Sequence, residues 1–467
     1  MAEQQRKLNT LDSESLLQRE GVIILLLGIS VVLVIMNTAM FNLALNDLGH
    51  YFNLPPSTIA LTVTGYSIAF AISSITFSRL SDFVPLRRLF AISLVSAGAA
   101  SLVAMLSTQF WLLLAARIVQ ALGAGAAISL SIVLLTRYVP LARRGKTMSV
   151  IMSSVSLGLG LGPVVGGFVV QYMGWKYLFA ITALLLCIAP FLVRQIPKEK
   201  FEKRPFDVPG AITLSAGTAG LLLFLTSFNP LPLLIGIAGL AAFVWRIRKT
   251  AHPFVLPSLL ADKTYLALSF VGVLSYLCSF STLFLLPQML LKHFGLSASH
   301  AGFIIFPGAI LSMLLSRAIG SIIDKYGNGG ILRLAPFMIL TSVILFALLG
   351  TRFWIADIAV YMLMNVGFAM IGSSVSNEIS RILPKSQIGS GTGLYQLMQF
   401  FAGAFSIAVV SIALELQHNL PLGQAFANLF WGLAGVAILA NLCAVLYSRL
   451  KNKIGLSGTL ANAGRSE

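Results

Sequence analysis

Long apolar runs, separated by short polar segments, dominate this chain and constrain its fold more than any other feature. A helix needs about 20 mostly apolar residues to cross about 30 Å of hydrocarbon. Fourteen runs fit this length, and with 57% hydrophobic and only 10% charged residues no soluble core could bury them. The sequence therefore predicts an all-α membrane protein with 14 transmembrane helices. The predicted spans are 21–45, 57–78, 88–107, 110–137, 147–172, 175–194, 209–227, 230–247, 265–291, 298–323, 330–350, 353–382, 388–416 and 424–448.

The basic residues gather in every second connection between these runs. If the N-terminus lies inside the cell, only Lys176, Lys292 and Arg352 of the 32 Lys and Arg face outward, and Arg117 falls within a helix. Cytoplasmic connections carry such an excess of positive charge. The pattern predicts a multi-pass protein of the inner (cytoplasmic) membrane with both termini in the cytoplasm. The net charge of +17 is then a topology signal, and we expect no nucleic acid partner.

The most hydrophilic stretch between spans, 198–204, divides six helices from eight. Spans seven and eight contain Asn229 and hydroxyl groups as their notable polar side chains before the basic end, so we expect a lipid-facing hairpin. Removing it leaves two six-helix bundles. The predicted division is a cytoplasmic tail at 1–20, an N-terminal bundle at 21–204, the extra central hairpin and linker at 205–264, a C-terminal bundle at 265–450 and a cytoplasmic tail at 451–467.

Small residues mark the fifth span. Gly158, Gly162 and Gly166 recur every four residues on one helix face, with Pro163 and Gly167 beside them. Such a stripe lets another helix approach closely, and the proline bends the rod. Ordinary small-residue packing is the alternative interpretation, but a bend beside a close contact is typical of helices that move.

Two charged turns have matching positions in the two halves. The first runs from Arg79 through Asp82 to the pair Arg87 and Arg88, and the second, from Gly320 to Gly327, contains Asp324 and Lys325. Repeats of this kind are expected in a duplicated transporter. Topology alone would account for the basic residues but not for two Asp in one register. An Asp held by an Arg, or by the positive end of a helix, could stabilise one conformation.

Arg117 lies within the fourth span, followed one turn later by Gln120. A charged side chain in the membrane is costly, so it indicates function by default. The alternative is a structural arginine that binds backbone carbonyls.

Three motifs together resemble a known family. The glycine run resembles the antiporter signature of major facilitator exporters. The first turn resembles their loop signature, although Ser78 and Pro85 replace glycines, and Arg117 with Gln120 resembles their helix-four motif, although Ala121 replaces a glycine. From Val22 to Tyr447 the chain resembles the fourteen-helix drug/proton antiporter branch of the major facilitator superfamily, especially tetracycline and multidrug efflux proteins of Gram-positive bacteria.

The resemblance implies a transporter rather than an enzyme: a secondary active exporter of small amphiphilic molecules in the cell membrane. The implied activity is drug efflux by alternating access and proton-coupled antiport, with antibiotic resistance as the outcome. The resemblance also implies a coupling residue, the arginine of the helix-four motif, which is Arg117 here. Two alternatives stay open. One is an exporter or flippase of an endogenous lipid-like or peptide metabolite without proton coupling, and the other is a transport-dead membrane sensor.

Acids are absent where that branch usually carries them. Asn37 and Thr38 occupy the candidate acid positions of the first span, and Gln396 and Gln399 occupy the middle of the thirteenth. The acids that fall within spans lie near helix ends, namely Asp357, Glu378 and Glu415. We expect a neutral, zwitterionic or anionic substrate, and coupling through Glu378 or Asp357 if protons drive transport. Pairing of Glu378 with Arg381 or another inner base is the alternative.

The remaining polar groups of the spans suit a mostly apolar binding chamber. The predicted substrate-binding residues are Asn37, Asn42, Tyr66, Gln120, Asn365, Gln396 and Gln399. All five His lie at helix ends or in loops, so we expect neither a metal site nor a cofactor. The expected partners are a small amphiphilic substrate, protons and membrane lipids, and the expected assembly is a monomer.

Overall fold

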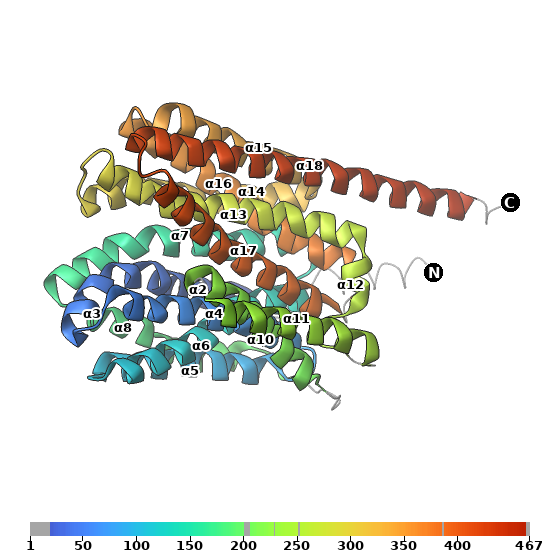
Figure 1. Cartoon of the computed structure of the whole chain (residues 1–467). Coiled ribbons are helices and arrows are strands. Elements are labelled where there is room, and N and C mark those ends of the chain that lie inside the picture. The colour runs from blue at the N-terminus through green and yellow to red at the C-terminus, as the bar shows by residue number, and fades with distance from the viewer. Residues whose placement is uncertain (1–18, 200–205, 228, 251–252, 385–386, 464–467) are drawn as a thin grey trace.

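The computed structural model describes residues 19–199, 206–227, 229–250, 253–384 and 387–463. Within these ranges the chain is almost entirely helical and forms no strand, and most of the helices run along one common direction (Figure 1). Thirteen helices there are long and apolar enough to cross a membrane, and Val208–Phe224 is a shorter apolar helix. These segments agree with the predicted fourteen-helix membrane fold. The predicted tail residues 1–18 and 464–467, and the linker residues 200–205, lie outside the described ranges.

The helices follow the predicted order. The first half contains α2 Glu20–Phe41, η1 Asn42–Ala44, α3 Leu45–Phe52, α4 Pro56–Leu80, α5 Leu86–Leu106, α6 Phe110–Tyr138, α7 Leu141–Tyr172, α8 Tyr177–Ala183 and α9 Leu185–Gln195. The hairpin region contains α10 Val208–Ser227, α11 Pro230–Lys249 and α12 Pro257–Ala261. The second half contains α13 Lys263–Lys292, α14 Ala298–Tyr326, α15 Gly329–Leu345, η2 Phe346–Gly350, α16 Trp354–Ile382, α17 Ile388–Leu416 and α18 Leu422–Ala463.

Three helix ends differ from the prediction. The first span changes to a 3₁₀ turn at Asn42, and α3 then ends at Asn53, whose φ of 51° is left-handed. The sixth span is divided at Leu184 into α8 and α9. The last helix does not end near residue 450 but continues to Ala463, and it projects past its neighbours in Figure 1. Its extension is anchored where Lys451 donates to the buried Glu378.

Two apolar cores organise the molecule. One core gathers buried side chains from Ile23 to Ile196, and the other gathers those from Ala211 to Tyr447. Tyr276 from the second half also packs in the first core. The halves meet mainly where α7 contacts α14 and α16 and where α4 contacts α17. The predicted domain boundaries at 204, 264 and 450 stay a prediction.

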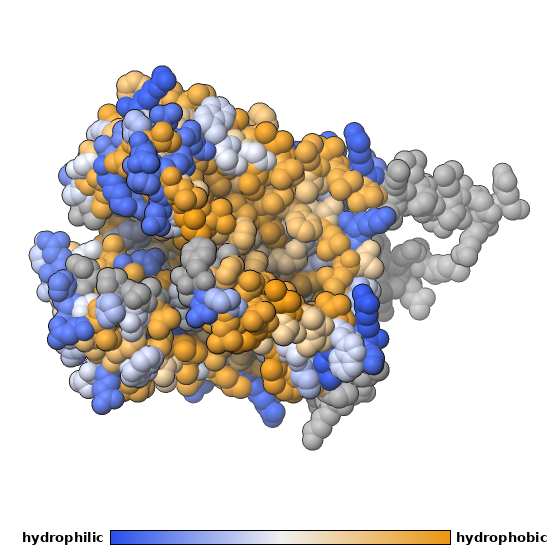
Figure 2. All heavy atoms as spheres, in the orientation of Figure 1, coloured by the Kyte–Doolittle hydropathy of each residue, from blue (hydrophilic) through white to orange (hydrophobic). Residues whose placement is uncertain are grey.

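The surface suits a bilayer. Figure 2 shows a wide hydrophobic band between two ends where hydrophilic residues gather. Large apolar side chains of the spans are exposed, including Leu314 at 72% and Trp111 at 67%. Lipid tails would cover such residues at no cost. One end of the molecule holds the basic last turns of α4, α6, α11, α14 and α16, and we call it the basic end.

The hairpin α10–α11 packs outside the two bundles. Its helices touch through glycines, since a Cβ on Gly220 would lie 2.5 Å from the backbone nitrogen of Gly236. Helix α10 also contacts α4 and α17, whereas α11 exposes Leu231, Leu234 and Trp245 by about 60% each. The hairpin is therefore lipid-facing through α11, as expected.

Candidate transport pathway

Arg117 is buried inside the N-terminal bundle, with 1% exposure. Its Nη1 donates to Asn37 Oδ1 on α2 at 2.7 Å and to Gln120 Oε1 at 2.6 Å. The guanidinium carbon lies 3.9 Å from the ring centroid of Phe41 and 4.1 Å from that of Tyr66. Amide oxygens and ring faces therefore surround this cation, and within the described residues no carboxylate pairs with it.

The amide of Gln120 is buried in the same bundle. Its Oε1 accepts from Arg117, its Nε2 donates to Ser101 Oγ on α5 at 2.6 Å, and the residue has no exposed surface. These contacts turn the side chain into the bundle, and the binding role predicted for Gln120 stays a prediction. Around this guanidinium, Arg117 Nε and Asn37 Nδ2 have no hydrogen-bond partner among the described residues. Buried donors normally have a partner, so this is the place for a water or a moving proton.

Aromatic side chains fill the place where the two halves meet. Phe70 on α4 packs edge-on against Phe400 on α17, with centroids 4.6 Å apart. Tyr276 on α13 lies 5.9 Å from Phe400 and stacks on Phe280 at 4.1 Å. Phe368 on α16 completes the group at 5.6 Å from Tyr276. We call these five residues the interface aromatics. Tyr66 stacks on Phe70, with centroids 6.0 Å apart, and so joins them to Arg117.

Two predicted binding residues lie at this interface. Ser74 on α4 donates to Gln396 Oε1 on α17, which joins the halves directly. Asn365 Oδ1 on α16 accepts from Ser312 Oγ on α14 at 3.3 Å. The Ser312 carbonyl in turn accepts from Ser153 on α7, at 3.0 Å. Polar groups from both halves therefore converge beside the interface aromatics.

The other predicted binding residues are more exposed. Asn42 lies in the short η1 turn at the end opposite to the basic end, and its side chain is exposed. Gln399, one turn after Gln396 on α17, is half-buried beside Phe400. Asn37 and Tyr66 line the Arg117 pocket and not a separate site.

The two candidate coupling acids have different surroundings. Asp357, in the first turn of α16, is fully buried, and neither of its carboxylate oxygens has a partner among the described residues. Glu378 accepts from Asn328, Tyr447 and Lys451 at the basic end of the C-terminal bundle. Its basic partner is thus Lys451 and not the neighbouring Arg381. Pairing with an inner base other than Arg381 was one of the alternatives that the sequence left open for Glu378.

The first charged turn packs between α17 and the hairpin. Asp82 Oδ2 accepts from Arg79 at 2.8 Å, and Arg137 lies 3.8 Å from Asp82 Oδ1. Arg79 also donates to the carbonyl of Pro253, in the segment after the hairpin, at 3.3 Å. Burial raises the pKa of the Asp82 carboxyl above its ordinary value, although Arg79 and then Arg137 lower it. The turn therefore joins three parts of the chain.

The basic pair predicted beside Asp82 lies elsewhere. Arg87 and Arg88 begin α5, and in the described part of the chain neither forms a salt bridge with Asp82. The gating role predicted for this pair stays a prediction. Arg79 and Arg137 hold Asp82 instead.

The second charged turn joins the halves through a helix end. Asp324 Oδ1 accepts from the backbone nitrogen of Gly145 at 2.7 Å, and Oδ2 accepts from that of Lys146 at 3.0 Å. Both donors lie near the N-terminus of α7, where the helix dipole favours a carboxylate. Lys325 is exposed next to Asp324 and lies 5.1 Å from the Tyr326 ring. The geometry is the one expected for an Asp held by the positive end of a helix.

Across the described chain, the side-chain hydrogen bonds that join the halves lie in the basic half or near the middle. Ser78 donates to the carbonyl of Gly389 at 2.8 Å, and Arg144 donates to Ser380 at 2.9 Å. The other such bonds join Ser74 to Gln396, Ser153 to the Ser312 carbonyl, and Asp324 to the backbone of α7. The molecule is therefore closed at its basic end.

Helix α7 uses its glycines to contact two neighbours. A Cβ on Gly158 would lie 2.9 Å from the Cβ of Ile35, and methyl groups on Gly162 and Gly166 would overlap Ala39 and Met40, all on α2. Between these positions Gly160 faces Ala309 on α14. A Cβ on Gly167, which lies outside the stripe, would meet nothing within 4 Å.

The family model described as Major Facilitator Superfamily matches residues 27–407. The chain belongs to the major facilitator superfamily. It is 23% identical over 94% of its length to the riboflavin transporter RibZ of Clostridioides difficile, 99% of which is covered. It is 27% identical over 79% of its length to the multidrug resistance protein B homolog of Mycobacterium tuberculosis, with 71% of that protein covered. One similar protein is thus named as a riboflavin transporter and another as a multidrug resistance protein.

The superfamily fold is also found in solved structures. The proton:xylose symporter XylE matches with a TM-score of 0.68 at 16% identity, over 90% of this chain and 94% of that one. This likeness shows the fold. Together with the family match it makes the chain a transporter rather than an enzyme.

Sequence reasoning missed the interface aromatics of this major facilitator protein. The chain has 31 Phe and 11 Tyr, most of them in apolar spans, and composition does not separate those that face the other half from those that face lipid. A helical-face comparison of α4 with α17 would have been the available signal, but it requires knowing which helices pair.

Proposed function

We propose that this transporter exports small amphiphilic molecules from the cytoplasm by alternating access, working as a monomer with its basic end in the cytoplasm. The basic last turns of five helices support this orientation, because positive charge marks the cytoplasmic side. The closed basic end corresponds to one of the two states that alternating access requires.

The observation that carries the proposal is a cluster of five aromatic side chains between the halves, with no carboxylate from the described residues in contact with it. Flat apolar rings with a few amide and hydroxyl groups nearby suit a drug-sized amphiphile. The acids that could neutralise a cation lie elsewhere, since Glu378 is paired with Lys451 and Asp357 lies at the start of α16. We infer a substrate that is neutral, zwitterionic or anionic.

A planar aromatic metabolite is a second candidate substrate. The riboflavin transporter RibZ is similar to this chain over almost its whole length. An isoalloxazine ring is flat, aromatic and uncharged, and it would stack between Phe70 and Tyr276 or their neighbours. Efflux of drugs, as the name of the mycobacterial relative suggests, would use the same aromatic surface.

Counterflow in proteoliposomes tests both proposals. The library contains riboflavin and amphiphiles that are cationic, neutral or anionic, each measured with and without a pH gradient. We expect exchange of neutral or anionic compounds and little exchange of lipophilic cations. Strong preference for cations would overturn the proposed substrate class, and the absence of exchange for every compound, with ligand binding retained, would favour a membrane sensor.

A matched pair of variants tests whether the interface aromatics form the binding surface. Phe400→Ala removes a ring from the centre of the interface, whereas Phe405→Ala removes one that is 38% exposed on the same helix. We expect the first to lower the apparent affinity about tenfold, since a well-placed aromatic contact contributes on the order of 1 kcal/mol beyond burial. Equal effects of the two changes would remove the interface aromatics as the binding surface.

Proton coupling, if it drives export, has Asp357 as its proposed proton carrier and Arg117 as a residue that stays charged and responds to it. Asp357 is a buried acid whose oxygens are unpartnered in the described chain, and Arg117 has a free donor in the N-terminal bundle. Glu378 is already paired, which favours a structural role. Asp357→Asn should abolish the pH-gradient dependence of transport, with counterflow retained. Unchanged gradient-driven transport would exclude Asp357.

A further inference from the structure

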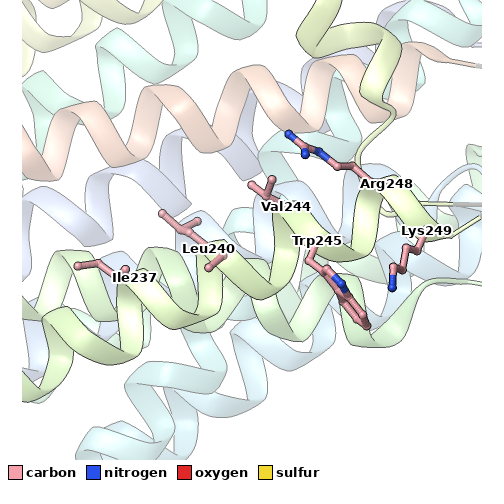
Figure 3. A pocket seen from close by; sticks show the side chains of 7 residues that line it. Ile237, Leu240, Val244, Trp245, Arg248 and Lys249 are labelled. Atoms are coloured by element: carbon pink, nitrogen blue, oxygen red, sulfur yellow. The ribbon is translucent and has the colours of Figure 1, made fainter.

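Helix α11 carries a groove on the lipid side of the hairpin. It has a volume of about 620 Å³ and is lined by Ile237, Leu240, Ala241, Val244, Trp245, Arg248 and Lys249. All seven residues belong to one helix (Figure 3). The groove lies outside the two bundles and shares no residue with the pathway described above.

Two ridges of side chains form this groove. Leu240, Val244 and Arg248 follow one another four residues apart, and in Figure 3 they lie along one side of the helix. Trp245 and Lys249, which follow Ala241 at the same spacing, lie along the other side. Rows of residues four apart are the natural ridges of a helix, with a groove between them. The small Ala241 leaves room at its floor.

The dimensions of the groove match one leaflet of a membrane. From Ile237 to Lys249 a helix rises about 18 Å, at 1.5 Å per residue. Half of a hydrocarbon core is about 15 Å. The apolar part, from Ile237 to Trp245, rises about 12 Å and so covers most of one leaflet's acyl region. Trp245 then lies where aromatic belts meet the headgroups.

Both ridges end in a cation at the basic end. Lys249 Nζ lies 4.4 Å from the Trp245 ring centroid, and Arg248 is exposed beside it. Their neighbour Arg246 is different, because its Nε donates to Asp207 at 2.6 Å. Asp207 also accepts from the backbone nitrogens of Gly210 and Phe254, at 3.0 and 3.1 Å. That acid is therefore committed, and within the described residues Arg248 and Lys249 form no salt bridge.

We propose that this groove binds one anionic phospholipid of the cytoplasmic leaflet. An acyl chain lies between the ridges, and the headgroup phosphate is held by Arg248 and Lys249 next to Trp245. A second copy of this chain is a poor occupant, because the same face would bring two further unpaired cations against these. The negative lipids of the inner leaflet supply the complementary charge.

The test measures lipid retention by the full-length protein with native mass spectrometry, using phosphatidylglycerol and phosphatidylcholine as probes. Arg248→Gln combined with Lys249→Gln should lower the affinity for phosphatidylglycerol about thirtyfold, since each cation near the surface contributes on the order of 1 kcal/mol. Bound phosphatidylcholine should not change. Ala241→Trp, which fills the groove floor, should lower retention of both lipids.

A control pair separates a built site from general charge. Arg333→Gln with Arg449→Gln removes two exposed cations from the C-terminal bundle and should leave phosphatidylglycerol retention unchanged. Equal loss in the control pair would overturn the proposal, as would full retention after either groove change. Displacement of the lipid by excess inorganic phosphate would also contradict it, because the acyl chain is part of the site.

Discussion

At the scale of single residues, the surroundings of Arg117 are the least ordinary feature of the molecule. A buried cation normally has an acid partner, because an unpaired charge in low dielectric is costly. Here two amide oxygens and the faces of Phe41 and Tyr66 supply the compensation. Neutral partners stabilise the charge less than a carboxylate would. The guanidinium is thus held strongly enough to be positioned and weakly enough to respond to a nearby charge.

The shape of the guanidinium is as important as its charge. Arg117→Lys keeps the charge but loses the planar group that serves Asn37 and Gln120 together and stacks on the rings. We expect at least a tenfold loss of counterflow, with monodisperse protein. Arg333→Lys, at an exposed position, is the matched control and should transport normally. Full activity of Arg117→Lys would show that charge alone is needed.

Asp82 adds a pH dependence at the basic end. Its carboxyl is buried in the closed state, and burial raises its pKa above 3.8. Opening would expose the group to water and return the pKa towards that value, so the closed state binds the proton more tightly. Lowering the pH through the window above 3.8 should therefore increase the closed population. Spin labels on the two halves report the distance, and Asp82→Asn should remove this pH response.

At the scale of helices, α7 is the element on which both halves depend. Its glycines at 158, 162 and 166 admit α2, and Gly160 admits α14 from the other half. Close contact through small residues is a common way to pack helices in lipid, where no hydrophobic force drives association. The same rod thus belongs to one bundle and contacts the other, as a helix at a moving interface would.

One methyl group tests this arrangement. In Gly162→Ala the new Cβ would overlap Ala39, whereas in Gly167→Ala it would meet nothing within 4 Å. We expect the first change to cost about 1–3 kcal/mol of stability through overpacking. The second should be neutral or slightly stabilising, because alanine is the better helix former. Thermal unfolding in detergent measures both, and equal midpoints would disprove the close approach.

The helices themselves were predictable because apolar length is a strong signal, and fourteen segments appear where the runs are. The breaks at Asn42 and Leu184 were not, because each falls inside an apolar run that carries no charge, proline or glycine at that point. Packing decides such breaks. For the same reason the motif residue Asp324 could be assigned to a helix end, but its two backbone donors on α7 required the fold.

The hairpin is held to the first charged turn by polar and aromatic contacts. Asp207 binds Arg246 and the backbone of Phe254, and so fixes both ends of the hairpin to each other. The adjacent Pro253 carbonyl accepts from Arg79, which also holds Asp82. Phe206 packs between Phe83 and Phe254, at 5.9 and 5.7 Å. The hairpin therefore contacts the first charged turn directly, although its outer helix faces lipid.

At the scale of the whole molecule, the two charged turns close the same end by different means. The first turn holds Asp82 with arginine side chains of its own half and presents Ser78 to the carbonyl of Gly389 on α17. The second presents Asp324 to backbone nitrogens of the other half. The molecule is thus asymmetric despite its repeat, and Asp324 is the acid that spans the halves.

The Asp324 contact gives the most direct test of closure. In Asp324→Asn one carboxylate oxygen becomes an amide that faces a backbone N–H, so one charge-assisted hydrogen bond, about 1.5–3 kcal/mol, is lost. A loss of this size shifts a two-state equilibrium at least tenfold towards the open basic end. Distances between spin labels at exposed Arg88 and Arg333, on opposite halves, should lengthen in a fraction of molecules that is larger than in the wild type. Asp82→Asn, whose acid accepts from its own half, should change the distribution less. If both variants keep the wild-type distances, the closure rests on helix packing rather than on either carboxylate, and alternating access would have to be controlled elsewhere.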